Sequence, residues 1–121
     1  LQATRLMNEW GIGALVIVEE GRMVGIFTER DVLRRVVAME RNPARTPVAE
    51  VMTREVLCCH PRVLIEEARE IMMEQRVRHL PVVNDDGIPL GMISIGDLNA
   101  HQVHEQQRQI GDLHEYLYGR S

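Results

Sequence analysis

Apolar residues along this chain gather in short runs that come in pairs, with a polar, glycine-containing turn inside each pair. Residues 14–18 and 23–27 form the first pair, and residues 80–84 and 90–93 form the second. Two such runs around a turn predict a β-hairpin. The run at 14–18 shows no polar alternation, so we expect that strand to be buried on both faces. The pattern therefore predicts two hairpins, one in each half of the chain.

Helical periodicity flanks the first hairpin on both sides. Apolar residues spaced by three and four in the first ten positions predict a helix that ends at Gly11, with Met7 and Trp10 in its buried stripe. After the hairpin, Thr28 is a natural N-cap for a second helix. The buried stripe of that helix is expected to be Val32, Leu33, Val36 and Val37. Its solvated face is expected to carry Arg30, Arg34 and Arg35.

The second half of the chain adds elements before its hairpin. Residues 48–52 predict a short helical turn, residues 56–59 a strand that ends at a His-Pro pair, and residues 66–75 a helix with acidic residues in its first turn. The expected order in each half is strand–helix–strand–strand–helix. The first half lacks the leading strand, because the chain starts inside its helix.

The organisation expected from this order is one module over residues 1–121. Residues 40–47 contain two prolines and no apolar period, which is typical of a connector. We therefore expect a first repeat at 1–47, a second repeat at 48–102 and a helical tail at 103–121. The predicted fold class is α+β, with α/β-type repeats. Each repeat is a small three-stranded sheet with two helices, and a pseudo-twofold axis relates the repeats.

The tail carries a weak heptad pattern. Val103, Ile110 and Leu117 are spaced by seven, and Leu113 adds a contact three positions after Ile110. Two interpretations are open, since so few heptads fall short of a firm coiled-coil signal. The tail packs back on its own domain, or it forms the contact of a homodimer.

An internal repeat links the two halves. Residues 25–31 (GIFTERD) and residues 91–97 (GMISIGD) share glycine, two apolar residues, a hydroxyl residue and, three positions after it, Asp. The apolar runs before the two copies also correspond. Because repeated units of this kind report a repeated architecture, the two halves are expected to share one fold.

The hydroxyl and the carboxylate of the motif have two interpretations. Ser or Thr followed three positions later by an acid forms a capping box, in which the acid accepts from a free N–H group at the helix start. The acid is Asp in both copies, whereas the box favours Glu, and the whole strand–cap–acid unit recurs. A carboxylate and a hydroxyl at a helix start can also hold a sugar diol, with exposed N–H groups that suit phosphate. The two roles can coexist.

Composition narrows the class of protein. A chain of 121 residues with 45% hydrophobic and 26% charged residues is typical of one globular domain. The net charge of −4 does not indicate a nucleic-acid partner, and no apolar run approaches the roughly 20 residues of a membrane span. Cys58 and Cys59 are adjacent, and vicinal cysteines rarely bridge each other, so we expect a reducing, cytoplasmic location.

Catalysis and metal binding have weak support. His101 and His104 are three residues apart with Glu105 adjacent, but a complete site needs more ligands, so no metal is predicted. No nucleophile–base pair, phosphate-binding glycine loop or CxxC motif is present in the sequence. We therefore predict that the chain is not an enzyme.

The sequence resembles a CBS-domain pair, the Bateman module. The resemblance rests on the doubled motif, on "VMTREV" at the start of the second half and on "VRHLPVVNDDG" before its hairpin, and it extends to about Gln102. It implies a regulatory module, without catalytic activity, that has two clefts between its halves. The implied ligands contain adenosine: AMP, ADP or ATP, with NAD or S-adenosylmethionine as further possibilities.

The resemblance also implies site residues. At the first cleft, Asp31 would hold ribose hydroxyls with Thr28 beside it, and Met52, Thr53, Gly13 and Ala14 would border the ligand.

At the second cleft the corresponding pair is Asp97 and Ser94, with Arg78 and His79 placed to face phosphates. The segment that would complete this second cleft precedes Leu1 in the pattern of the family. The first cleft has no counterpart of the Arg78 and His79 cations.

Three functional hypotheses follow. The chain is a ligand-sensing module that acts on an unknown regulated protein, a structural dimerisation module without nucleotide, or a regulatory fragment of a larger enzyme or transporter. The doubled carboxylate favours the first hypothesis.

Overall fold

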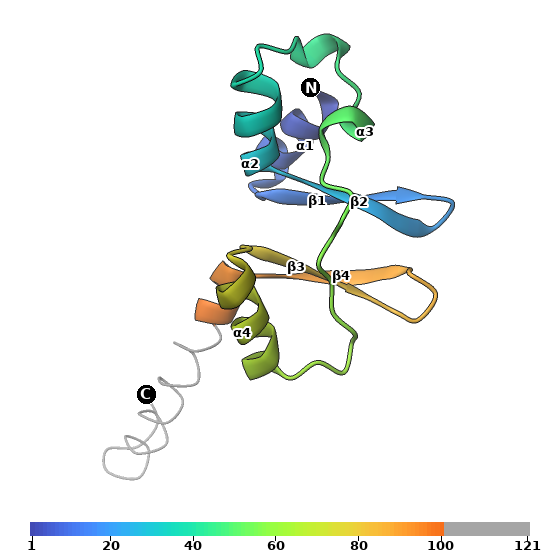
Figure 1. Cartoon of the computed structure of the whole chain (residues 1–121), viewed down its shortest axis with the longest axis vertical. Helices are drawn as coiled ribbons and strands as arrows, with labels where there is room; N and C mark the ends of the chain where they lie inside the picture. Colours follow the sequence, from blue (N-terminus) through green and yellow to red (C-terminus); the bar gives the residue numbers. More distant parts are fainter. Residues whose placement is uncertain (101–121) are drawn as a thin grey trace. The chain divides into compact units, whose positions relative to one another are not determined.

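The computed structural model of the chain describes residues 1–100 (Figure 1). These residues divide into two compact units. The first contains residues 1–62 together with 81–92, and the second contains residues 63–80 together with 93–100. The expected dimer seam from Val103 to Leu117, with His101 and His104, lies outside the described residues. The homodimer therefore stays a prediction.

The first hairpin forms as the sequence predicts. Strand β1 (Ala14–Glu19) pairs antiparallel with β2 (Arg22–Thr28), in a register that sets Ala14 opposite Thr28. The expected burial of β1 on both faces is wrong toward the turn, where Val18 is 47% exposed. Only the end of the strand that lies beside the helices is fully covered, and Ala14 there is 3% exposed.

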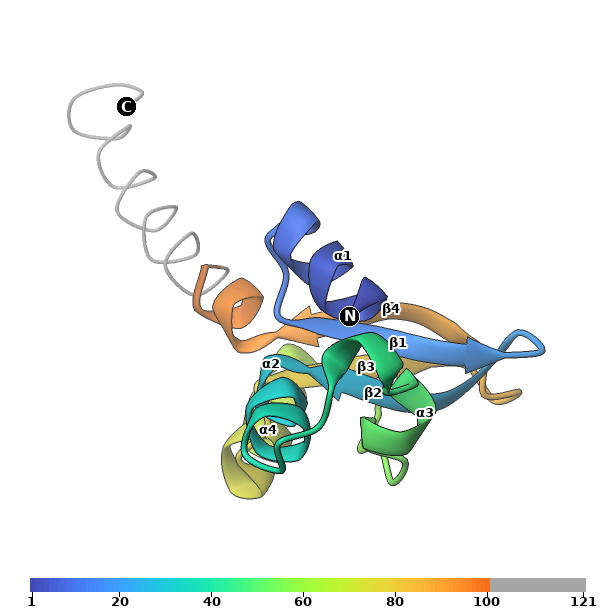
Figure 2. The ribbon, with the colours of Figure 1, turned by 90° about the horizontal axis from the view of Figure 1, so that it is seen from above.

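Helix α1 (Gln2–Trp10) packs against β1, as Figure 2 shows, and ends at Gly11 in the left-handed conformation. Met7 is buried, as expected, in a core cluster with Phe27 and Val36. The prediction for Trp10 is wrong, because its side chain is 70% exposed. Trp10 is the last residue of the helix, directly before the Gly11 reversal, whereas Met7 lies in the stretch that packs on the sheet.

The helix after β2 begins where the sequence predicts but has a different pitch. Thr28 caps α2 (Glu29–Asp31), and the chain continues as a π-helix, η1, over Val32–Val37. In a π-helix the hydrogen bonds join residues five apart, so each turn is wider than in an α-helix. The apolar stripe therefore shifts: Val36 is buried, but Leu33 and Val37 are more than half exposed, contrary to expectation.

The connector returns the chain to the first hairpin. A 3₁₀ turn, η2 (Pro43–Arg45), is capped by Asn42, and α3 (Val48–Val51) forms the predicted short helical turn. Val51 and Met52 then enter the core cluster of this first unit. This brings the residues after α3 against β2.

The second hairpin repeats the first. Strands β3 (His79–Val83) and β4 (Pro89–Ser94) form a two-stranded sheet, and Ser94 ends β4 as Thr28 ends β2. The predicted α+β fold with one small sheet in each half is therefore present. The first sheet has the two strands expected of a repeat that lacks its leading strand, whereas the second sheet has two strands rather than the predicted three.

The predicted leading strand at 56–59 is reduced to a single parallel bridge between Cys59 and Val82. The Cys59 N–H donates to the carbonyl of Pro81 (2.9 Å), and the Val83 N–H donates to the carbonyl of Cys59 (2.9 Å). Extending this ladder in either direction would require an N–H group from Pro81 or from Pro61. Proline has none, so the pairing stops after one bridge.

In the second unit, helix α4 (Ile65–Gln75) carries Glu66 and Glu67 in its first turn, as the sequence predicts. Its residues Ala68 and Met72 are buried. Residues 95–100 are helical, and their backbone connects to α4 through Arg69, whose guanidinium donates to the carbonyl of Leu98 (3.3 Å). Among residues 1–100, no helix has the length and apolar content needed to cross a membrane.

Candidate ligand site

Asp31 is the centre of the motif in the first unit, and its carboxylate is buried, with 6% of the residue exposed. Its Oδ2 accepts from the backbone N–H of Thr28 (2.9 Å), and the Asp31 N–H in turn donates to Thr28 Oγ1 (3.3 Å). This is a complete capping box. The capping interpretation of the first copy is therefore confirmed.

A second segment reaches the same carboxylate from 22 residues away. Thr53 Oγ1 donates to Asp31 Oδ1 at 3.0 Å. The Thr53 backbone forms an antiparallel bridge with Ile26 of β2, with N–O distances of 2.8 and 2.9 Å. The structure thus brings together Asp31 and Thr53, two residues that the family resemblance placed in one site.

Gly25 explains how this segment comes so close to β2. A Cβ atom at residue 25 would lie 2.6 Å from Sδ of Met52 and 2.9 Å from the carbonyl oxygen of Thr53. Real Cβ atoms essentially never make such short contacts, so only glycine fits here. The first glycine of the motif is therefore a packing residue in this copy.

Arg35 is a site residue that the sequence analysis assigned to a solvated face. Its Nη1 donates to the carbonyl of Met52 at 2.7 Å, and its Nε lies 3.7 Å from Asp31 Oδ1. The side chain is 48% exposed, so the guanidinium lies at the surface of the buried carboxylate. The signal that could have found it is the i,i+4 spacing of opposite charges from Asp31 to Arg35.

The remaining predicted residues of the first site lie next to the motif. The Glu29 N–H donates to the carbonyl of Gly13 at 3.1 Å, and Ala14 is buried opposite Thr28 in the hairpin register. Met52 is 4% exposed. The structure therefore places all six predicted residues of the first site in one contiguous neighbourhood.

Asp97 occupies the corresponding position in the second unit but is exposed. The Ser94 N–H donates to Asp97 Oδ2 at 3.3 Å, and the Asp97 N–H donates to Ser94 Oγ at 3.0 Å, so the reciprocal capping pattern recurs. Arg78 is exposed, and its carbonyl accepts from the N–H of Ile95 at 2.9 Å. That bond connects the chain just before β3 to the residue after Ser94. His79, half-buried, is the first residue of β3.

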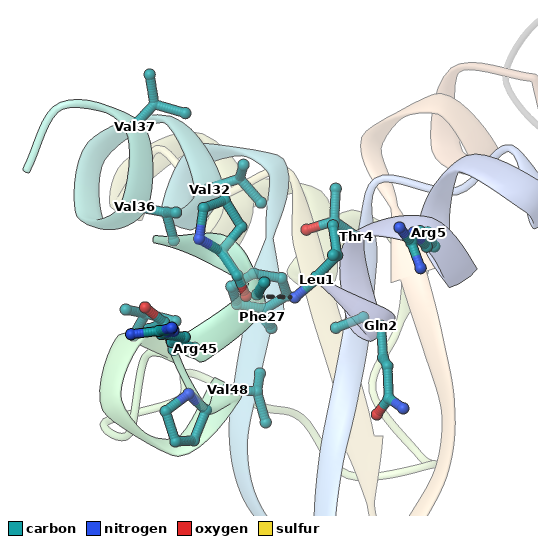
Figure 3. Close-up of a pocket in the computed structure, with 16 residues that line it drawn as sticks. Leu1, Gln2, Thr4, Arg5, Phe27, Val32, Val36, Val37, Arg45 and Val48 are labelled. Carbon is teal, nitrogen blue, oxygen red and sulfur yellow. Dashed lines mark hydrogen bonds between the residues drawn. The ribbon is translucent and has the colours of Figure 1, made fainter. Parts of the chain in front are cut away.

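A cavity of about 670 Å³ lies elsewhere in the first unit, between α1, η1 and the connector (Figure 3). Its apolar wall includes Phe27, Val36 and Val48, and Leu1 also lines it, with the N-terminal amine donating to the carbonyl of Pro43 (3.2 Å). None of the predicted ligand residues lines this cavity.

The cysteines and histidines of the described residues form no metal site, since no group of three or more potential ligands comes together there. Cys59 is 8% exposed, and burial, followed by the neighbouring Cys58, raises the pKa of its thiol above the ordinary value. His60 Nε2 lies 3.3 Å from Asp85 Oδ1 at the surface.

A family model, curated relatives and solved structures all match this chain. The chain matches the CBS domain family over residues 1–38 and 48–103. It is 36% identical to the mitochondrial CBS domain-containing protein CBSX3 of Arabidopsis thaliana over 97% of its own length, and it spans 59% of that relative's length.

Two solved structures share the fold. A protein with CBS domains from Burkholderia ambifaria has a TM-score of 0.81 at 44% identity, with 87% of this chain and 76% of the other covered. The CBS domain pair of protein MJ0100, solved with 5′-methylthioadenosine and S-adenosyl-L-methionine, has a TM-score of 0.75 at 25% identity, with 86% and 81% covered.

Proposed function

Because the chain belongs to the CBS-domain family, we propose that it is a regulatory module that senses an adenosine-containing ligand of the AMP, ADP or ATP class. The ligand would bind at the hydroxyl–carboxylate motif of each repeat. The adenosine-containing molecules bound to the MJ0100 domain pair support this ligand class, and they keep S-adenosylmethionine among the candidates.

The observation that carries the proposal is the state of the second motif. The Asp97 carboxylate is exposed, and among residues 1–100 its hydrogen bond comes from the Ser94 cap. A carboxylate has room for about four hydrogen bonds, so this one retains acceptor capacity for a ribose diol. Hydrogen bonds from hydroxyl groups to an ionised acceptor are short and strong.

Arg78 and His79 would supply the ligand's phosphate contacts at this motif. Arg78 is exposed and its backbone is bonded to the residue after Ser94, so the cation belongs to the same neighbourhood as the carboxylate. A guanidinium offers a planar set of donors that matches phosphate oxygens. At the first motif, Thr28 and Asp31 would contact the ribose, bordered by Gly13, Ala14, Met52 and Thr53.

Sensing follows from differential binding. A ligand that binds one arrangement of the module more tightly than another shifts the population toward that arrangement, by no more than the difference in affinity. The regulated partner would respond to this shift.

A second candidate, a regulatory segment of a larger protein, is supported by the fraction of the Arabidopsis relative's length that this chain spans.

The test is isothermal titration of the full chain with adenosine, AMP, ADP, ATP, NAD and S-adenosylmethionine, with guanosine and uridine nucleotides as controls. Asp97→Asn should weaken the binding of adenosine ligands about tenfold or more, because the charge-assisted hydrogen bonds are lost. Asp86→Asn, an exposed carboxylate in the second hairpin turn, is the matched control and should leave affinity unchanged. The proposal fails if no adenosine ligand binds, or if the two variants have equal affinity.

The phosphate role is tested separately. Arg78→Ala should weaken AMP and ATP far more than adenosine, since a guanidinium serves phosphate rather than ribose. Equal loss for adenosine and AMP would remove that role while leaving the ribose contact intact.

A further inference from the structure

A hydroxyl group of the chain itself already donates a hydrogen bond to the carboxylate of the first motif. Thr53 Oγ1 donates to Asp31 Oδ1 at 3.0 Å, while Asp31 Oδ2 is engaged by the N–H of Thr28. With Nε of Arg35 at 3.7 Å, the buried carboxylate has a partner on each oxygen and a cation beside it. The bound hydroxyl comes from the chain itself, 22 residues away.

Backbone hydrogen bonds, Arg35 and the space left by Gly25 keep the segment that carries Thr53 in place. Both backbone hydrogen bonds of the Ile26–Thr53 bridge are formed. Arg35 donates to the carbonyl of Met52 at 2.7 Å and lies 3.4 Å from that of Val51. Gly25 leaves the space that the segment fills. The Thr53 backbone is therefore held beside Asp31, where its short side chain places the hydroxyl within hydrogen-bond distance of Oδ1.

We propose that Thr53 sets the ligand affinity of the Asp31 motif by competing with the ligand for the carboxylate. This inference rests on the proposed function, since the competing group would be the ribose diol of the adenosine ligand. Because the Asp31 carboxylate is buried, a diol that reaches Oδ1 must first displace the Thr53 hydroxyl. The cost of breaking that hydrogen bond lowers the apparent affinity for the ligand. The Asp97 motif holds no such hydroxyl within the described residues, so its affinity is not lowered by this displacement.

The competition also couples the first motif to the start of the second repeat. Thr53 lies two residues after the end of α3, and Arg35 connects the π-helix after Asp31 to the carbonyl of Met52. A ligand that releases Thr53 from Asp31 removes one of the contacts that hold residues 51–53 on β2. Ligand binding at this motif therefore loosens the start of the second repeat.

The test isolates the first motif by titrating AMP into the full chain that carries Asp97→Asn. In that background Thr53→Val, which keeps the shape and removes the hydroxyl, should tighten AMP binding about tenfold, since hydrogen bonds to charged groups are among the stronger ones. Thr53→Ser keeps the hydroxyl and should leave the affinity unchanged. Weaker binding by Thr53→Val would show that Thr53 contacts the ligand favourably, and unchanged binding would show no competition. Either result overturns the inference.

Amide hydrogen exchange provides a readout that needs no ligand. Thr53→Val should speed the exchange of the amides of residues 26 and 53, which form the bridge, and Thr53→Ser should not. Equal exchange in all three proteins would overturn the claim that the Thr53–Asp31 bond holds the segment. If the chain without Asp97→Asn binds no adenosine ligand, the proposed function fails. If that chain binds and Thr53→Val does not change the affinity of the first motif, only the competition fails.

Discussion

The two copies of the motif adopt the same local structure in different surroundings. Thr28–Asp31 and Ser94–Asp97 both form the reciprocal cap of a helix start. Asp31 is nevertheless buried and bonded to Thr53, whereas Asp97 is exposed. Four residues are enough to determine a cap, because a cap needs only its own hydroxyl, carboxylate and N–H groups. Burial depends on which distant segment covers the cap.

The motif glycines show the same contrast. Gly25 is in close contact with Met52 and Thr53, whereas a Cβ at Gly91 would meet no atom within 4 Å among the described residues. The same residue type at the same motif position therefore has a steric role in one copy that the other does not show. A repeat in the sequence thus predicts a repeat in the fold without predicting equal function of its sites.

The largest effect is expected from Gly25→Ala. The added Cβ would collide with the Thr53 backbone, and overpacking of this kind typically costs about 1–3 kcal/mol of folding free energy. Gly91→Ala is the matched control, and its stability should stay close to that of the unchanged chain. Urea denaturation of both variants measures the difference. Equal stability of the two variants would show that the 52–53 segment does not hold its position on β2.

A smaller effect is expected when the two carboxylates are compared. Asp31→Asn removes the charge from a buried acceptor that serves Thr28, Thr53 and Arg35 but keeps a neutral oxygen acceptor. A hydrogen bond to a charged group exceeds a neutral one by about 1 kcal/mol, so the expected loss of folding free energy is about 1 kcal/mol. Asp97→Asn changes an exposed residue and should stay within about 0.5 kcal/mol. Thermal unfolding in the absence of ligand compares them. A larger loss of stability for Asp97→Asn would contradict the conclusion that Asp31 is the more tightly bonded carboxylate.

The smallest effect concerns the adjacent cysteines, which differ in burial as the motifs do. Burial raises the pKa of the Cys59 thiol, which lowers the fraction of reactive thiolate at Cys59. Cys58 is only half-buried, so a reagent reaches its sulfur more easily. Alkylation at mildly alkaline pH, followed by peptide mass mapping, should modify Cys58 first. Faster modification of Cys59 would contradict the observed burial.

The raised pKa of Cys59 predicts that folding stability falls at alkaline pH, which denaturation at several pH values can check. The folded state holds the thiol proton more tightly than the unfolded state, so the contribution of Cys59 is complete below the ordinary thiol pKa. It declines as the pH rises through the raised value. Cys59→Ala should flatten this alkaline decline.

Much of the local structure was predictable from the sequence. The two hairpins, the Gly11 reversal, the Thr28 cap and the short turn at 48–51 all follow from short-range patterns, and all are present. The single bridge at Cys59 was predictable only in part. The two prolines that stop the ladder are visible in the sequence, but their effect follows only once Cys59 is known to pair with Val82.

The predictions that failed each depended on what packs against a residue. Trp10 fits the apolar stripe of α1 but lies beyond the packed part of the helix. Leu33 and Val37 were placed by an α-helical period that the π-helix does not follow. Arg35 looked like a surface residue, because nothing in its neighbourhood along the chain shows that the carbonyl of Met52 will arrive beside it.

The sequence by itself determined the doubled fold, the caps and the identity of the two motif carboxylates, because these depend on residues within a few positions of one another. Only the tertiary structure decided that Asp31 is occupied by Thr53 and bordered by Arg35. That outcome depends on a contact between residues 22 positions apart. Such a contact forms where Gly25 leaves room and the backbone of β2 offers hydrogen bonds, and neither condition appears in the spacing of the motif itself.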